Sequence, residues 1–169
     1  FKKKVTLYPD STRAHTLLGL AYTEQGRRKP AINHFKKAIR LDSLYAPAYH
    51  GLGKLYMLYG RTSSAIHYLE KAHEIDLTFG PAVFDLAQAY FRVKEFQKSI
   101  GAYTHALTID SRHDVIKTNL AMAYAMEGNL RKAKQLFYEV IKSNNGNIDA
   151  RDGLAQILLS EGNKQEALE

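Results

Sequence analysis

Apolar and small side chains return along the chain at a fixed interval of 34 residues, and polar residues fill the positions between them. Five columns keep this register without an insertion: a leucine followed by a small residue, a tyrosine, a small residue, a bulky residue and a further small residue. The columns contain Leu18-Gly19, Leu52-Gly53, Leu86-Ala87, Leu120-Ala121 and Leu154-Ala155; Tyr22, Tyr56, Tyr90, Tyr124 and Leu158; Ala31, Ala65, Ser99, Ala133 and Ala167; Phe1, Phe35, Leu69, Tyr103 and Phe137; and Ala38, Ala72, Ala106 and Val140. Such self-similarity predicts a tandem repeat array.

Within each unit the spacing predicts two amphipathic helices. Tyr49, Leu52 and Tyr56 follow one another at intervals of three and four, which places them on one side of a helix. Pro47 and Pro81 fall in the first turn of such helices, where a missing N–H is tolerated. The expected fold is therefore all-α.

Glycine is expected to end the first helix of each pair, because glycine readily adopts the left-handed conformation that closes a helix. Lys94 stands where the third glycine should be, so that turn is expected to be strained or to close by another geometry. The glycines are Gly26, Gly60, Gly128 and Gly162, and the second helices are expected to end at Leu41-Asp42, Ile75-Asp76 and Ile109-Asp110.

Small residues are expected where the two helices of a pair touch. Gly19, Gly53, Ala31 and Ala65 would let the paired helices approach closely, while aromatic side chains fill the space between repeats.

Both ends of the sequence fall inside the repeat register, so we expect an excerpt of a longer array. Apolar residues at the two ends would then lack a covering repeat, which favours fraying or end-to-end stacking of the isolated excerpt. These residues are Phe1, Val5 and Leu7 at one end and Leu154, Ile157, Leu158 and Leu168 at the other.

Composition favours a soluble protein and leaves its compartment open between the cytoplasm, which is favoured, and a bacterial cell envelope. No stretch approaches the roughly 20 apolar residues that span a bilayer, and the chain has no cysteine.

Basic charge is concentrated in residues 1–45, which hold 10 Lys/Arg against 3 Asp/Glu of a chain with net charge +7. This excess indicates either a solvated outer face or an electrostatic footprint for nucleic acid, anionic lipid or an acidic partner. Nucleic acid is not expected, because no aromatic residue is interleaved in a recognised nucleic-acid motif.

Catalysis, metal binding and cofactor binding are not expected within these residues. The seven histidines are scattered through the repeat without a metal-ligand spacing, and no glycine-rich phosphate loop occurs. Asp42, Asp76 and Asp110 recur at the repeat interval, which indicates a structural turn.

The pattern Tyr49…Leu52-Gly53…Tyr56…Ala65…Leu69…Ala72 resembles the tetratricopeptide repeat, a 34-residue helix–turn–helix unit. This resemblance implies a right-handed superhelical solenoid of antiparallel helix pairs. Its repeats would occupy 12–45, 46–79, 80–113 and 114–147, with partial units at 1–11 and 148–169.

The resemblance further implies that the first helix of each pair lines a concave groove. All three methionines fall on this surface, together with two phenylalanines, and flexible Met side chains suit varied apolar partners. We therefore expect an adaptor that binds a peptide or an amphipathic helix of another protein. The expected groove residues are Thr16, Leu20, Thr23, His50, Lys54, Met57, Phe84, Asp85, Gln88, Phe91, Arg92, Thr118, Asn119, Met122, Met126 and Gln156, and the same stripe includes Ala125, Asp152 and Leu159.

Two alternatives stay open: the targeting arm of a larger enzyme such as a glycosyltransferase, and an electrostatic tether to nucleic acid or membrane through residues 1–45. Glycosyltransferase arrays of this family carry an asparagine ladder, of which only Asn119 is present. The carboxylate clamp of the co-chaperone members is not reproduced at Thr16 and Leu20, nor at His50 and Lys54.

Overall fold

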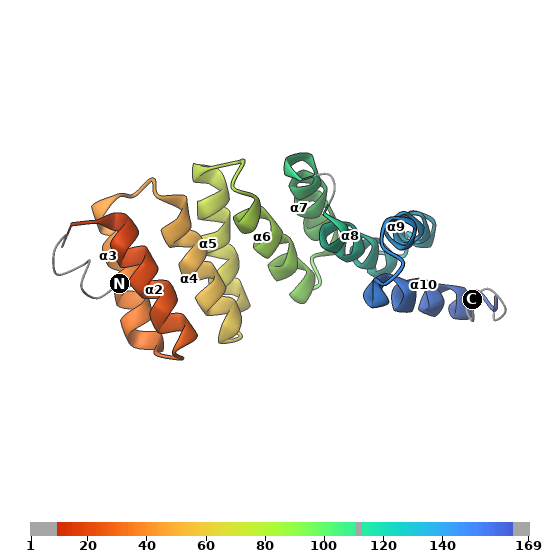
Figure 1. Cartoon of the computed structure of the whole chain (residues 1–169), viewed down its shortest axis with the longest axis horizontal. Coiled ribbons are helices and arrows are strands. Elements are labelled where there is room, and N and C mark those ends of the chain that lie inside the picture. The colour runs from red at the N-terminus through yellow and green to blue at the C-terminus, as the bar shows by residue number, and fades with distance from the viewer. Residues whose placement is uncertain (1–9, 111–112, 164–169) are drawn as a thin grey trace. The chain divides into compact units, whose positions relative to one another are not determined.

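The computed structural model describes residues 10–110 and 113–163, and every regular element in these ranges is an α-helix (Figure 1). The predicted all-α fold is confirmed, and each pair joins a first helix of 13 residues to a second helix of 14. The helices are α2 (Thr12–Glu24), α3 (Arg28–Leu41), α4 (Ala46–Leu58), α5 (Thr62–Ile75), α6 (Gly80–Arg92), α7 (Phe96–Ile109), α8 (Asp114–Met126), α9 (Leu130–Ser143) and α10 (Ile148–Ser160). None of them is long and apolar enough to cross a bilayer.

The first helices end as the glycine pattern predicts. Gly26, Gly60, Gly128 and Gly162 all have positive φ, between 68° and 89°. Lys94 takes the same left-handed conformation, with φ of 62°. The amides of Lys94 and Glu95 donate to the carbonyls of Phe91 and Tyr90, which is the pairing that also closes the turn at Gly26. The turn therefore closes by the same geometry as the glycine turns, and the expectation of another geometry is wrong.

The second helices end at Leu41, Ile75 and Ile109, as predicted. Asp42 and Asp76 follow directly, and their side chains accept hydrogen bonds from the backbone N–H groups of Leu44 and Thr78, each at 2.9 Å. An aspartate that accepts a bond two residues onward stabilises a tight turn. Structural turns thus account for these two recurring aspartates.

Two compact units make up the chain, Phe1–Ala89 and Tyr90–Glu169, which we call the N-terminal and C-terminal units. In the N-terminal unit, α2 lies beside α3 and α4 beside α5 (Figure 1). Its core includes Phe35, Leu52 and Leu55, each fully buried. In the C-terminal unit, a core around Phe137 and Val140 joins α8, α9 and α10.

Small residues do mark the closest helix contacts. A Cβ added at Gly19 would lie 2.6 Å from the ring of Phe35, and one added at Gly53 would lie 2.6 Å from Leu69 Cγ. No Cβ atom tolerates such distances, so glycine at these positions permits the contact between the paired helices.

The last described helix is covered, in contrast to the expectation of bare apolar residues at this end. Leu154, Ile157 and Leu158 are 8%, 5% and 3% exposed, and they share a core with Phe137 and Val140 of α9. Residues of α8 also belong to this core, so the three side chains are not bare. The other residues of that expectation, Phe1, Val5, Leu7 and Leu168, lie outside the described residues.

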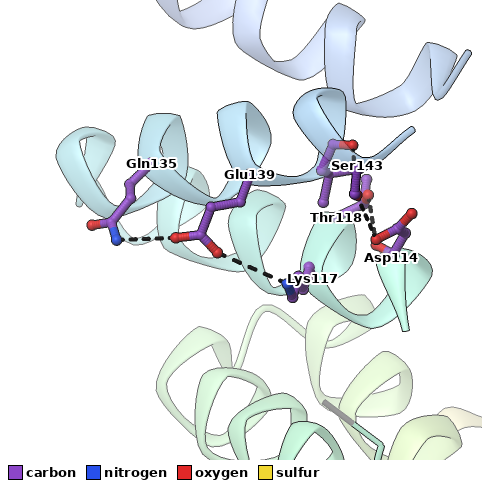
Figure 2. A network of polar contacts seen from close by, with 7 residues as sticks. Asp114, Lys117, Thr118, Gln135, Glu139 and Ser143 are labelled. Atoms are coloured by element: carbon purple, nitrogen blue, oxygen red, sulfur yellow. Dashed lines mark hydrogen bonds and ion pairs between the residues drawn. The ribbon is translucent and has the colours of Figure 1, made fainter. Parts of the chain in front are cut away.

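Polar contacts also join α8 to α9 (Figure 2). Ser143 Oγ donates to Asp114 Oδ1 at 3.0 Å, and Lys117 Nζ lies 3.9 Å from Glu139 Oε2. Gln135 Nε2 donates to the other oxygen of Glu139 at 3.1 Å. The first two contacts join α8 to α9 beside the shared core, whereas the third lies within α9.

Candidate functional site

The residues expected to line the groove lie on first helices in both units. Nine belong to the N-terminal unit: Thr16, Leu20, Thr23, His50, Lys54, Met57, Phe84, Asp85 and Gln88. Seven belong to the C-terminal unit: Phe91, Arg92, Thr118, Asn119, Met122, Met126 and Gln156.

A hollow of about 500 Å³ lies in the C-terminal unit. It brings together four of the seven predicted residues of that unit, namely Phe91, Met122, Met126 and Gln156, and two more from the same stripe, Ala125 and Asp152. The full lining is Phe91, Met122, Ala125, Met126, Leu130, Phe137, Asp149, Asp152, Gly153, Gln156, Ile157 and Ser160.

One wall of the hollow is apolar. Met122, Ala125 and Met126 are spaced three and four residues apart on α8, so they face the same side of that helix. The ring of Phe91 is supported by Phe96 in an edge-to-face contact, with centroids 5.5 Å apart. Met122 is half-buried, whereas Met126 is exposed.

A second wall comes from α10 and is largely polar. Asp149, Asp152 and Gln156 recur at intervals of three and four along it, and all three are exposed. Gly153 lies between them, and a side chain added there would collide with the ring of Phe137. The missing side chain at Gly153 allows Phe137 of α9 to reach the hollow.

Sequence reasoning missed Asp149 as well as Leu130, Phe137, Gly153, Ile157 and Ser160. Asp149 had a usable signal, because it stands one helical turn before Asp152 on the same face. Ser160 had the same signal, because it stands one helical turn after Gln156 on the same face. Phe137 and Ile157 had none, since they belong to the apolar pattern of the core.

Polar groove residues of the N-terminal unit are bonded to one another. His50 Nε2 donates to Asp85 Oδ2 at 2.7 Å, and Lys54 Nζ lies 4.0 Å from the same oxygen. The His50 ring also meets the Phe79 ring edge-to-face, with centroids 5.3 Å apart. The half-buried Asp85 carboxylate is therefore already contacted by two groups of α4.

Two predicted groove residues are buried. Thr16 and Thr118 occupy equivalent places in α2 and α8, and each hydroxyl donates to the carbonyl four residues earlier, at 3.0 Å and 2.9 Å. These hydroxyls are hydrogen-bonded to the backbone of their own helix, and the buried side chains offer little surface to a partner. In the N-terminal unit, Leu20 of α2 is exposed and Met57 of α4 is half-buried.

No group of three or more His, Cys, Asp or Glu side chains within residues 10–110 and 113–163 is placed to hold a metal ion. The arrangement of the hollow is suited to side chains of a partner, since it combines an apolar wall with a row of polar groups.

Three protein-family models match parts of this chain. A model described as "TPR repeat" matches residues 19–60, and two described as "Tetratricopeptide repeat" match residues 46–79 and 124–169. The chain belongs to the tetratricopeptide repeat family. Among curated protein sequences, none matches it significantly.

Solved structures share this fold over most of their length. A crystal structure of MamA is 26% identical, with a TM-score of 0.83, covering 89% of this chain and 88% of that one. YrrB, described as a TPR protein with an unusual peptide-binding site, is 20% identical, with a TM-score of 0.86, covering 99% and 86%. The pilF protein of Pseudomonas aeruginosa is 19% identical, with a TM-score of 0.78, covering 89% and 69%. Tetratricopeptide repeats generally serve protein interaction, so these matches support a protein-interaction scaffold.

Proposed function

We propose that this tetratricopeptide repeat chain binds a peptide or an amphipathic helix of a partner protein on its first helices, and that the hollow of the C-terminal unit is the main contact site. The observation that carries this proposal is the convergence of Phe91, Met122 and Met126 on one hollow. Phe91 and Met122 lie on the predicted stripe and Met126 lies beside it, and none of the three belongs to the five packing columns. Met122 also packs against the core of this unit.

The size and character of the hollow fit a few side chains of a partner. Its volume of about 500 Å³ falls within the range of roughly 300–1,000 Å³ that ligand pockets show. Methionine adapts its shape to different apolar groups, which suits a scaffold that accepts peptides. Partner side chains would contact the α8 wall, and polar groups of α10 would orient them.

The electrostatic tether has less support, because part of the basic charge is engaged within the N-terminal unit. The guanidinium of Arg27 lies 4.9 Å from the centre of the Tyr22 ring, and that of Arg28 lies 4.8 Å from the centre of the Tyr59 ring. Lys37 lies 4.0 Å from Asp10. The enzyme-arm alternative rests only on Asn119 and has no further structural observation behind it.

The test selects random phage-displayed peptides on the immobilised chain and measures their binding to variants by fluorescence anisotropy. Met122→Glu with Met126→Glu should weaken the selected peptides by about tenfold or more, because charge is placed against their apolar side chains. The matched control is Leu44→Glu with Leu77→Glu, which changes two side chains that are 73% and 58% exposed in turns.

The control variant should bind as the parent does, and helical circular dichroism should be the same for all three proteins. Binding that survives both glutamate pairs but disappears on charge reversal at Lys36 and Lys37 would contradict the proposal. That result would move the site to the basic face of α3 and favour the electrostatic tether.

A further inference from the structure

The charge of the hollow is opposite in sign to that of the whole chain. Among the described residues that line it, Asp149 and Asp152 are the only ionisable ones, and none of these lining residues is Lys, Arg or His. The chain as a whole has a net charge of +7. A partner segment that enters the hollow therefore meets a local negative field that the overall composition does not indicate.

Both carboxylates are available to a partner. Asp149 and Asp152 are exposed, and no ion pair with either is formed among residues 10–110 and 113–163. Other acidic side chains of this unit have basic partners: Glu161 lies 2.6 Å from Lys134 Nζ. Asp149 also lies in the first turn of α10, where the helix dipole favours a charged carboxylate.

In the N-terminal unit, Asp85 is less available to a partner than Asp149 and Asp152 are. Asp85 also stands on a first helix, but His50 and Lys54 of α4 already contact its carboxylate. A basic group of a partner would gain little there, because it would compete with these contacts. The C-terminal unit, rather than the N-terminal unit, should therefore select partner segments by their charge.

We infer that the hollow selects a partner segment in which a lysine or arginine stands beside apolar side chains, and this inference rests on the proposed function. Apolar side chains of the segment would contact Met122, Met126 and Phe91. The long stem of a lysine or arginine can lie along this apolar wall while its charged end reaches the α10 carboxylates. An acidic segment of the same shape would be repelled by both aspartates.

The experiment compares two fluorescein-labelled amphipathic peptides with the same leucines, one carrying lysine and the other glutamate at every polar position. The lysine peptide should bind more tightly, and its affinity should decrease as salt is added. Asp149→Asn with Asp152→Asn should weaken it by about three- to tenfold, as expected for two exposed charge contacts. The matched control is Glu74→Gln with Glu95→Gln, which makes the same change in net charge at exposed residues outside the hollow.

Equal affinity for the two peptides, no binding of the lysine peptide, or equal behaviour of the aspartate variant and its control would each overturn the inference. Thermal unfolding of the aspartate variant checks that α10 is intact. The proposed function is judged separately with the phage-selected peptides. If these need Met122 and Met126 but are not cationic, the proposed function stands and the charge selection is wrong.

A second copy of the chain is the other possible occupant. Sedimentation velocity of the chain alone would detect it, since the aspartate changes would then alter its own association. That outcome would also overturn the inference, whereas an unchanged sedimentation coefficient together with loss of lysine-peptide binding supports it.

Discussion

The ring of Phe35 in α3 occupies the space that a side chain at Gly51 in α4 would need. The same ring also lies against Gly19 of α2, so one aromatic side chain packs onto two successive first helices. Phe35 is fully buried and has no room to move aside. The contact between these helix pairs therefore depends on the missing side chain at Gly51.

Gly51→Ala should destabilise the N-terminal unit. Overpacking a filled core costs roughly 1–3 kcal/mol and helix propensity gains about 1 kcal/mol, so a net loss of up to roughly 2 kcal/mol is expected. Gly101→Ala in α7 is the matched control, because a Cβ there has no neighbour within 4 Å, and it should stabilise the chain by about 0.5–1 kcal/mol. Urea denaturation followed by circular dichroism measures both. A gain in stability at both positions would contradict the packing account.

Lys94→Gly should stabilise the chain by about 1 kcal/mol, because lysine is held in a left-handed conformation that glycine adopts without steric strain. Gly128→Lys is the reciprocal change, at a glycine with φ of 89° and no neighbour near its Cβ position. It should lower the free energy of unfolding by a similar amount. Opposite signs for the two substitutions in chemical denaturation are the expected result, and equal signs would show that the turn is not strained.

Ala65→Leu should cost roughly 1–3 kcal/mol in stability, because Ala65 is fully buried where α4 and α5 meet. Its carbonyl oxygen already lies only 3.4 Å from the position of a Cβ at Gly53. Chemical denaturation measures the effect. A variant as stable as the parent would mean that this column does not mark a tight contact.

The free energy of unfolding should decrease as the pH is lowered below the usual histidine pKa of about 6.5, in part because of His34. Burial lowers the pKa of His34, and the neighbouring His15 lowers this pKa further. The two Nδ1 atoms are 2.9 Å apart, so one ring must donate while the other accepts. The unfolded chain then takes up the proton at a higher pH than the folded chain. The stabilisation is complete above the unfolded pKa of about 6.5 and is lost as the pH falls toward the lowered folded value.

His34→Gln should make the free energy of unfolding less dependent on pH between 7 and 5, as measured by urea denaturation at a series of pH values. His67→Gln is the control, since His67 is exposed on α5 and contacts Tyr68 edge-to-face. The free energy of unfolding of this control should depend on pH as it does in the parent protein. If both variants changed the pH dependence of the free energy of unfolding equally, the His15–His34 contact would have no special role in it.

The all-α fold, the ends of the helices and the columns of close contact could all be predicted from the amino-acid sequence. Each of these follows from local chemistry: an apolar period of three to four, a glycine with positive φ, or a small residue opposite a bulky one. Even Lys94 was identified as an irregular turn, because it interrupts a glycine column. Family membership rests on the same packing columns, which explains why it could be predicted from them.

Only the tertiary structure decided which groove residues are available to a partner. Periodicity gives the direction of a side chain around its own helix, but its exposure depends on the neighbouring helices. For that reason Thr118 is buried while Met126, two turns further on, is exposed. The bond from His50 to Asp85 joins residues 35 positions apart, and Leu154 and Leu158 are covered by α9. The hollow itself requires α8, α9 and α10 to meet, because its apolar and acidic walls come from different helices.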